Sequence, residues 1–340
     1  MHKSLALLPW LLAAGLLSSA SLGIRGAAAT GKAASTPATD KLSKAVLVTG
    51  ASSGIGREIT ERLARDGYFV YATARKDADL AALGAIRNVQ PVRLDVTHPA
   101  DIEAAVELIT KAGRGLYGLV NNAGIGTFGT IADMSPEEFD LCMKVNAYGP
   151  VMMIKAFETL VIAQKGRIIN IGSLSGILTS PNIPAYVMTK HAIEGLTDSL
   201  AVQLAPLGVQ VSVVEPGNYR GNIDKNMLAR LPEATKEKII TALGSKLDAA
   251  QYPEPTDVAL AVEQALFEPS PKRRYVVVTN DPQIVERTIR RQIEQLVQLN
   301  EGQPYTYDRA DLVRMLDEAL ASARPRTKYV GFPGSDANKQ

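Results

Sequence analysis

The stretch that decides the fold is AVLVTGASSGIGREITERLARDG, residues 45–67. It begins with a short, apolar, β-branched run and passes through a turn that contains three glycines. After the turn, Ile55, Ile59 and Leu63 recur at helical spacing until Gly67. The stretch therefore predicts a buried strand, a tight turn and an amphipathic helix in direct succession.

The glycines of this turn are Gly50, Gly54 and Gly56. Glycines at such positions let the backbone turn sharply and approach a pyrophosphate, whose charge is stabilised at the N-terminus of the following helix. A glycine-rich turn alone is a weak indicator of cofactor binding. Its place here, between a first strand and a helix, is the one that the mechanism requires, so the sequence predicts a dinucleotide-binding turn.

The remainder of the chain alternates between predicted strands and helices, and most strands are continuously apolar. This pattern is typical of a parallel sheet that is covered on both faces, so we expect an α/β fold with a doubly wound parallel sheet. The further strands are expected at 68–74, 89–96, 116–124, 166–171, 209–217 and 274–279, and the further helices at 101–113, 136–161, from about 185, and at 257–267.

The composition limits the classes of function. The chain has 340 residues, is 46% hydrophobic and has a formal net charge of +2, which is enough for one large α/β domain and gives no reason to expect a nucleic-acid partner. Its single cysteine, Cys142, excludes an intramolecular disulfide and a cysteine-based zinc site. The three histidines have no ligand spacing, so we expect no metal site.

The N-terminus has the pattern of a targeting segment. Lys3 precedes an apolar run over residues 5–17, and small residues follow it. The run is short for a membrane span and contains Pro9, which favours a signal-type segment. Residues 1–29 are predicted to be a signal peptide or signal anchor and residues 30–43 a flexible spacer, so we expect a membrane-associated or exported protein.

The C-terminal part, residues 281–340, is predicted to be a helical extension followed by a polar tail. Residues 281–299 form an amphipathic pattern with Arg287, Arg290 and Arg291 away from the apolar stripe, and a second helix is expected near 309–323. The extension can pack against the main domain, which we favour, or can contact a membrane surface or another subunit.

The residue after the second strand bears on the type of cofactor. NAD sites place an acidic residue there to hold the ribose 2′-hydroxyl, whereas this chain has Arg75, with Asp77 two positions later. An arginine can hold a 2′-phosphate, assisted by the hydroxyls of Ser52 and Ser53, so we expect NADP(H) rather than NAD(H). The alternative is that Arg75 is only a solvated loop residue.

Tyr186 and Lys190, in the segment YVMTK, lie one turn apart on the same face of a predicted helix that is rich in apolar residues. Taken alone, this pair is more often a core tyrosine beside a lysine that extends to solvent. The rest of the chain changes that interpretation.

The chain resembles the standard short-chain dehydrogenase/reductase family over residues 44–280, which implies a Rossmann fold and a catalytic domain of that type. Similarity to hydroxysteroid and retinol dehydrogenases is carried by YATARK, by NNAGIGTFG and by the C-terminal extension. The motifs of the family resemblance are TGASSGIG at 49–56, LDV at 94–96, NNAG at 121–124, Asn146, Ser173, YVMTK at 186–190 and EPG at 215–217.

The resemblance implies a catalytic tetrad. Tyr186 would be the general acid/base, and Lys190 would lower its pKa from about 10 and donate to the nicotinamide ribose. Ser173 would stabilise the developing alkoxide, and Asn146 would hold a water that links Lys190 to solvent. The cofactor-binding set implied by the turn and the family is Gly50, Ser52, Ser53, Gly54, Ile55, Gly56, Arg75, Asp95, Asn122, Ala123, Gly124, Tyr186, Lys190, Pro216 and Gly217, with Asp95 reaching the adenine.

One position departs from the family pattern. After Pro216 and Gly217 the family commonly has a threonine that binds the nicotinamide carboxamide, and this chain has Gly221 there. Either Asn218 or the backbone replaces that contact, or the loop orders when the cofactor binds.

The expected function is an NADP(H)-dependent interconversion of an alcohol with a ketone or aldehyde on a lipophilic steroid, retinoid or acyl substrate, bounded by the segment 218–255. The alternative is a catalytically silent NADP(H)-binding sensor or scaffold. The resemblance also implies a homo-oligomer that pairs through the helices carrying Asn146 and Tyr186. An exported domain would lack its cofactor, and an anchor that leaves the domain facing the cytoplasm would resolve this tension, but the charges on either side of the apolar run do not decide the orientation.

Overall fold

The structure is a computed structural model that describes residues 38–279 and 281–322. The predicted signal segment, most of the predicted spacer and the C-terminal tail lie outside the described residues. The end of the spacer differs from the expectation, because helix α1 (Ala38–Ser43) occupies it. The ammonium of Lys41 donates to the carbonyl oxygen of Asp66 at 3.1 Å and lies 5.1 Å from the ring centroid of Tyr68, which ties α1 to the following domain.

The elements alternate as the sequence predicted. The strands are β1 (Val46–Val48), β2 (Val70–Ala74), β3 (Val89–Arg93), β4 (Gly118–Asn121), β5 (Arg167–Ile171), β6 (Gln210–Pro216) and β7 (Arg274–Val277). The helices that cover them are α2 (Gly54–Arg65), α3 (Asp77–Gly84), α4 (Pro99–Ala112), α5 (Pro136–Met143), α6 (Gly149–Ala163), α7 (Pro184–Leu204) and α10 (Thr256–Phe267).

Within the described residues, the strands form one seven-stranded sheet in the order β3-β2-β1-β4-β5-β6-β7, and every neighbouring pair is parallel. Val46 of β1 is paired with Val70 of β2 on one side and with Gly118 of β4 on the other. This is the predicted doubly wound Rossmann fold, and β1 lies at the point where the strand order reverses.

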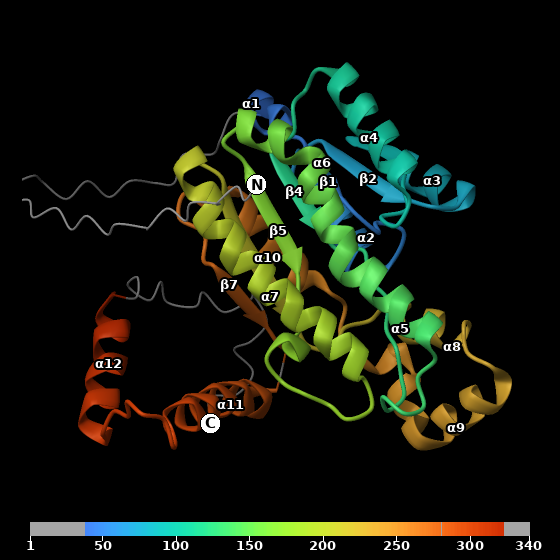
Figure 1. The fold of residues 1–340 in the computed structure, drawn as a ribbon. Helices are drawn as coiled ribbons and strands as arrows, with labels where there is room; N and C mark the ends of the chain where they lie inside the picture. Colours follow the sequence, from blue (N-terminus) through green and yellow to red (C-terminus); the bar gives the residue numbers. More distant parts are fainter. Residues whose placement is uncertain (1–37, 280, 323–340) are drawn as a thin grey trace, which may run out of the picture. The chain divides into compact units, whose positions relative to one another are not determined.

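Alternate residues of each strand supply two separate cores, one on each face of the sheet, and Figure 1 shows that helices cover both faces. Val46 and Val48 pack against α2, α3 and α10, whereas Leu47 between them packs against α4, α6 and α7. Both faces are covered, which explains why the strands are apolar at consecutive positions. The fully buried side chains that anchor the two cores include Ile59, Leu63, Leu83 and Leu266 on one face and Ile109, Phe157, Ile168 and Leu204 on the other.

The prediction of a single long helix over residues 136–161 is wrong. It consists of α5, a π-helical turn η1 (Lys144–Tyr148) and α6. Pro150 has no N–H to donate to the carbonyl of Asn146, so the α-helical ladder cannot pass this point unchanged. The N–H of Gly149 instead donates to the carbonyl of Lys144, five residues back, which widens the turn that carries Asn146.

The segment after β6, residues 218–255, for which no helix was predicted, contains regular structure. It contains the helices α8 (Ile223–Leu228) and α9 (Glu233–Leu243) and the short turns η4 (Gly244–Leu247) and η5 (Ala249–Gln251). Two other short 3₁₀ turns, η2 (Leu174–Gly176) and η3 (Ala205–Leu207), flank α7.

The C-terminal extension contains the two predicted helices, α11 (Pro282–Asn300) and α12 (Arg309–Ser322). The expected packing of the extension against the main domain stays a prediction, and in the described residues the apolar stripe of α11 is not covered. Ile289, Ile293 and Val297 are each more than half exposed, and Thr288 is the buried residue of the helix. Among the described residues, no helix is both long enough and apolar enough to cross a bilayer.

Candidate active site

The glycine-rich turn lies between β1 and α2, at the carboxyl edge of the sheet. Gly50 has a φ of +65°, and a Cβ atom there would lie 2.9 Å from the Cα of Ala123, so only glycine fits. Ser53 caps α2 without a side-chain hydrogen bond to the helix, which leaves the first N–H groups of α2 available to an anionic group. The turn therefore fits the pyrophosphate of a dinucleotide.

Thr49 and Asn122 join this turn to the loop after β4. The Oγ1 atom of Thr49 accepts the N–H groups of Asn122 and Ala123, each at 2.9 Å. The side-chain amide of Asn122 donates to the carbonyls of Thr49 at 2.8 Å and Gly50 at 3.2 Å. Asn122, Ala123 and Gly124, predicted to line the cofactor, are thus held against the turn.

The end of the site that would hold the adenosine is formed by Arg75 and Asp95, at the ends of β2 and β3. The side chain of Arg75 is 68% exposed, and its Nη1 donates to the carboxylate of Asp95 at 3.3 Å. Burial raises the pKa of Asp95, but hydrogen bonds from Thr97 and Arg75 outweigh this effect and leave that pKa below its usual value. The two residues predicted to bind different parts of the cofactor are therefore paired with each other.

Asn146 lies in the π-helical turn and is 2% exposed. Its side-chain oxygen accepts the N–H of Ile125 at 2.8 Å, and its amide donates to the carbonyl of Ile125 at 2.9 Å and to the hydroxyl of Thr189 at 3.3 Å. Asn146 therefore connects the loop after β4 to α7, one residue before Lys190.

Ser173, Tyr186 and Lys190 come together between β5 and α7. Ser173 caps η2, where its Oγ accepts the N–H of Ser175 at 3.1 Å, and its side chain lies close enough to Tyr186 to lower the pKa of that hydroxyl. The Nζ atom of Lys190 donates to the carbonyl of Ile171 at 2.8 Å and lies 5.5 Å from the ring centroid of Tyr186. The predicted tetrad is thus assembled from three separate segments of the chain.

The protonation of this pair differs from the expectation. Burial raises the pKa of Tyr186 to about 12, and the hydrogen bond from Ser173 only partly offsets it. Burial also lowers the pKa of Lys190 to about 8, against the opposing charges of Cys142 and Glu194. Lys190 does not lower the pKa of Tyr186 here because a lysine that loses its proton near pH 8 is neutral at the pH where Tyr186 ionises.

This arrangement can supply a proton to one substrate oxygen. Tyr186 is neutral and can donate its hydroxyl proton, Ser173 can donate a second hydrogen bond, and Lys190 lies where it can replace the proton.

Helix α8 brings a carboxylate close to these groups. A Cβ atom at Gly126 would lie 3.2 Å from the Cγ1 of Ile223, and Arg230, which is paired with Glu138, donates to the carbonyl of Gly126 at 2.7 Å. Both contacts place α8 against the loop after β4. Burial raises the pKa of Asp224, whose charge in turn raises the pKa of Tyr186.

The loop after β6 lies against the glycine-rich turn. A Cβ atom at Gly54 would lie 3.3 Å from the Cα of Gly221, the position where the family pattern has threonine. The N–H of Arg220 donates to the carbonyl of Pro253 at 2.8 Å, so this loop is tied to the residues before α10. Pro216 and Gly217 are placed at the end of β6, beside Ser173 in the sheet order.

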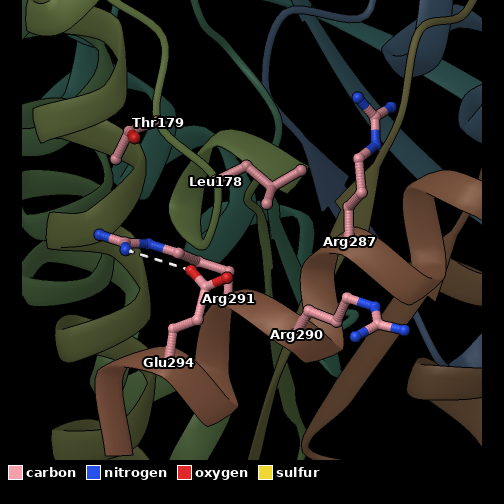
Figure 2. Close-up of a pocket in the computed structure, with 6 residues that line it drawn as sticks. All are labelled: Leu178, Thr179, Arg287, Arg290, Arg291 and Glu294. Atoms are coloured by element: carbon pink, nitrogen blue, oxygen red, sulfur yellow. Dashed lines mark ion pairs between the residues drawn. The ribbon is translucent and has the colours of Figure 1, made fainter. Parts of the chain in front are cut away.

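A separate cavity of about 370 Å³ lies between α11 and the loop after η2. Figure 2 shows that the heads of its three arginines, Arg287, Arg290 and Arg291, point in different directions, and that Arg291 faces Glu294 at 3.7 Å. Because the charges diverge, the cavity is not built to surround one anion.

The sequence did not single out several residues of the site. Thr49 and Thr189 were missed because a threonine has no distinctive spacing. Asn170, which accepts from Asn121 at 2.9 Å and donates to Thr197 at 3.0 Å, was also missed. A polar residue inside an otherwise apolar strand is the signal that could have identified Asn170.

The comparisons with known proteins agree with this geometry. The family described as short chain dehydrogenase matches residues 44–231. Rat mitochondrial D-beta-hydroxybutyrate dehydrogenase is 34% identical over 260 residues, covering 68% of this chain and 76% of the rat enzyme. Human 11-beta-hydroxysteroid dehydrogenase type 2 is 33% identical over 260 residues, and the match spans 68% of this chain but 63% of the human enzyme.

Two solved structures are similar over most of their length. A short-chain dehydrogenase/reductase from Burkholderia phymatum in complex with NAD has a TM-score of 0.66 and 25% identity, covering 78% of this chain and 98% of that one. A metagenomic short-chain oxidoreductase in complex with NADP has a TM-score of 0.56 and 30% identity, covering 69% and 96%. Both nicotinamide cofactors therefore occur among similar proteins.

Proposed function

Because this chain belongs to the short-chain dehydrogenase/reductase family, we propose that it uses NADP(H) to interconvert a lipophilic alcohol with its ketone or aldehyde, with Tyr186 as the general acid/base. The family assignment makes it an NAD(P)-dependent oxidoreductase that acts on CH–OH groups. The observation that carries the finer proposal is the convergence of Ser173, Tyr186 and Lys190 at the carboxyl edge of the sheet.

A nicotinamide cofactor bound at the glycine-rich turn would supply or accept the hydride. In reduction, the hydroxyl of Tyr186 would donate a proton to the substrate oxygen while Ser173 donates a hydrogen bond to the same atom. The pKa of Tyr186, raised to about 12 by burial, keeps this hydroxyl protonated and suits the direction of proton donation. Lys190, with a pKa lowered to about 8, can return the proton to the tyrosine near neutral pH.

The proposed preference for NADP(H) rests on charge. Arg75 carries the exposed guanidinium at the end of β2, and its carboxylate partner, Asp95, comes from β3 rather than from β2 itself. Arg93 donates to the carbonyl of Arg75 at 2.5 Å and also pairs with Asp77. Asp77, the nearby acid that could receive a ribose 2′-hydroxyl, is thereby neutralised, which favours a 2′-phosphate at this position.

The proposed substrate class follows from the surroundings of Tyr186. The charge of Asp224 would repel a small acid anion there, while Ile223 and the buried Met227 give α8 an apolar side. A neutral, lipophilic alcohol or ketone fits these surroundings better. One relative, human 11-beta-hydroxysteroid dehydrogenase type 2, is named for a substrate of this kind.

The experiment that tests this function replaces Tyr186 by phenylalanine. The wild-type protein should oxidise NADPH in the presence of a panel of lipophilic carbonyl compounds, and Tyr186→Phe should reduce kcat by roughly 10²-fold or more because the proton donor is lost. Tyr305→Phe, at an 89% exposed tyrosine, is the matched control and should retain full activity.

The alternative is a silent NADP(H)-binding sensor. Tight NADPH binding without turnover of any carbonyl compound or alcohol would establish the sensor and exclude the enzyme.

A further inference from the structure

Two glutamates of neighbouring elements are buried against each other beside the Ser173 loop. Glu215 is the penultimate residue of β6 and has no exposed surface. If Glu215 were ionised, both of its carboxyl oxygens would be buried acceptors without a donor among the described residues. The Oε1 atom of Glu194, on α7, would be in the same situation.

The Nε atom of Arg274 lies 3.1 Å from Oε2 of Glu194 and 3.9 Å from Oε1 of Glu215, so the two carboxyl groups meet at one guanidinium. Two carboxylates contain only acceptors, so a hydrogen bond between them requires one proton. We propose that Glu194 and Glu215 share a single proton at neutral pH, and that this carboxyl–carboxylate pair is a positioning element that fixes the loop carrying Ser173 against α7.

The surrounding charges support one proton and one negative charge on the pair. From β7, Arg274 donates to Glu194 at 3.1 Å and to Asp198 at 2.6 Å, and its Nε lies 3.9 Å from Glu215. Arg273 also donates to Asp198, at 3.5 Å. Two arginines thus face Asp198 and the pair, so one negative charge on the pair balances the cluster. A second negative charge on the pair would have no balancing arginine in this buried cluster.

The position of Glu194 explains how the pair can act on Ser173. A Cβ atom at Gly172 would lie 3.1 Å from the Oε1 of Glu194, and one at Gly176 would lie 2.9 Å from the same atom. Glu194 therefore contacts the backbone on both sides of Ser173. One turn earlier on α7, Lys190 donates to the carbonyl of Ile171. Glu194 and Lys190 therefore contact the same short segment. Glu194 keeps this position only while the pair retains its proton, because two ionised carboxylates would repel each other.

The pair has a defined pH window. Burial, and next the charge of Glu194, raise the pKa of Glu215 to about 8, above the usual value of 4.5. The folded protein then binds more protons than the unfolded chain between these values, so stability falls as pH rises from about 4.5 to about 8. Two other groups of α7 face this region. The hydrogen bond from Arg274 lowers the pKa of Asp198, so its contribution changes only below the window of the pair. The lowered pKa of Lys190, about 8, makes stability rise only above pH 8. Neither window overlaps that of the pair.

The test compares the wild-type full chain with Glu215→Gln between pH 5 and pH 8. Glutamine keeps the shape and provides a permanent donor to Glu194, so the thermal midpoint of the variant should rise relative to wild type by roughly 5 °C across this range. Asp198→Asn, which removes a half-exposed carboxylate from the same cluster, is the control. Its thermal midpoint should change with pH as that of the wild type does. A constant difference between Glu215→Gln and wild type would mean that Glu215 does not hold the proton, and would overturn the proposal.

A second measurement does not depend on folding of the variant. In wild-type protein with ¹³C-labelled glutamate carboxyl groups, one glutamate should titrate well above pH 6. If all glutamates titrate below that value, the shared proton does not exist.

The effect on catalysis rests on the proposed function and is measured separately. Glu194→Ala should lower kcat about tenfold, with little change in the KM for cofactor, and Glu194→Gln should restore most of kcat because it can still bond Glu215. Full activity in Glu194→Ala would remove the positioning role. Failure of the proposed function itself would instead appear as an active Tyr186→Phe variant, and would leave the proton titration unaffected.

Discussion

Tyr186 and Lys190 lie one turn apart on α7, and burial shifts each of them toward its neutral form. At the scale of the residue, the loss of water thus outweighs the charge of the neighbouring side chain. A neutral tyrosine is the form that donates a proton, so the same burial that stabilises packing also sets the direction in which this group can act.

Arg75 provides a prediction at this scale. Arg75→Asp should reduce the ratio of kcat/KM for NADPH to that for NADH by roughly 10- to 100-fold, because the new carboxylate repels a 2′-phosphate and can accept from a ribose hydroxyl. Steady-state kinetics with both cofactors measure the ratio. Arg87→Asp makes the same change of charge at an exposed residue outside the site and should leave the ratio unchanged. An unchanged ratio in Arg75→Asp would show that residue 75 does not contact the 2′ group of the cofactor ribose.

At the scale of the element, the π-helical turn η1 positions Asn146. The turn exists because Pro150 cannot donate to the carbonyl of Asn146, and it places the amide of Asn146 against both Ile125 and Thr189. The π-helical turn therefore determines where the side chain of Asn146 lies in the site.

Pro150→Ala tests this relation. The variant should regain an α-helical hydrogen bond, rotate Asn146 away from Ile125 and lower kcat at least tenfold, whereas the free energy of unfolding in urea should not decrease. Pro136→Ala, at the first turn of α5 where proline is well tolerated, is the matched control and should change neither quantity. Unchanged kcat in Pro150→Ala would mean that another contact fixes the turn.

At the scale of the whole molecule, the sheet and its two helical layers contain the apolar core, while α11 presents an apolar stripe outside it. Exposed stripes of this kind contribute little to the stability of the chain that carries them. The expected homo-oligomer and the expected membrane segment stay predictions. Light scattering of the purified protein and N-terminal sequencing after cell fractionation would test them.

The double variant Ile289→Gln/Ile293→Gln measures the role of the stripe. Both side chains are more than half exposed, so the free energy of unfolding should change by less than about 1 kcal/mol. Phe157→Ala, which removes a fully buried ring between the sheet and α6, should lower it by about 3–5 kcal/mol. A loss in the double variant comparable to that of Phe157→Ala would show that the stripe is covered in solution.

Several features of the fold and the site were predictable from short-range patterns. Continuous apolar runs predicted the parallel sheet, the glycines at 50, 54 and 56 predicted the tight turn, and the spacing of Tyr186 and Lys190 placed them on one helical face. The break in the helix at 144–148 was not predicted, although Pro150 marks it, because the pattern of apolar residues continues through a π turn without interruption.

The sequence by itself determined the order of strands and helices, the dinucleotide-binding turn and the chemical types of the residues at the site, since these depend on periodicity and on residues close in the chain. Only the tertiary structure decided which charges face each other. Arg75 meets Asp95, and Glu194 meets Glu215, across separations of 20 and 21 residues. Protonation depends on burial and on such partners, and both arise only when distant segments pack together.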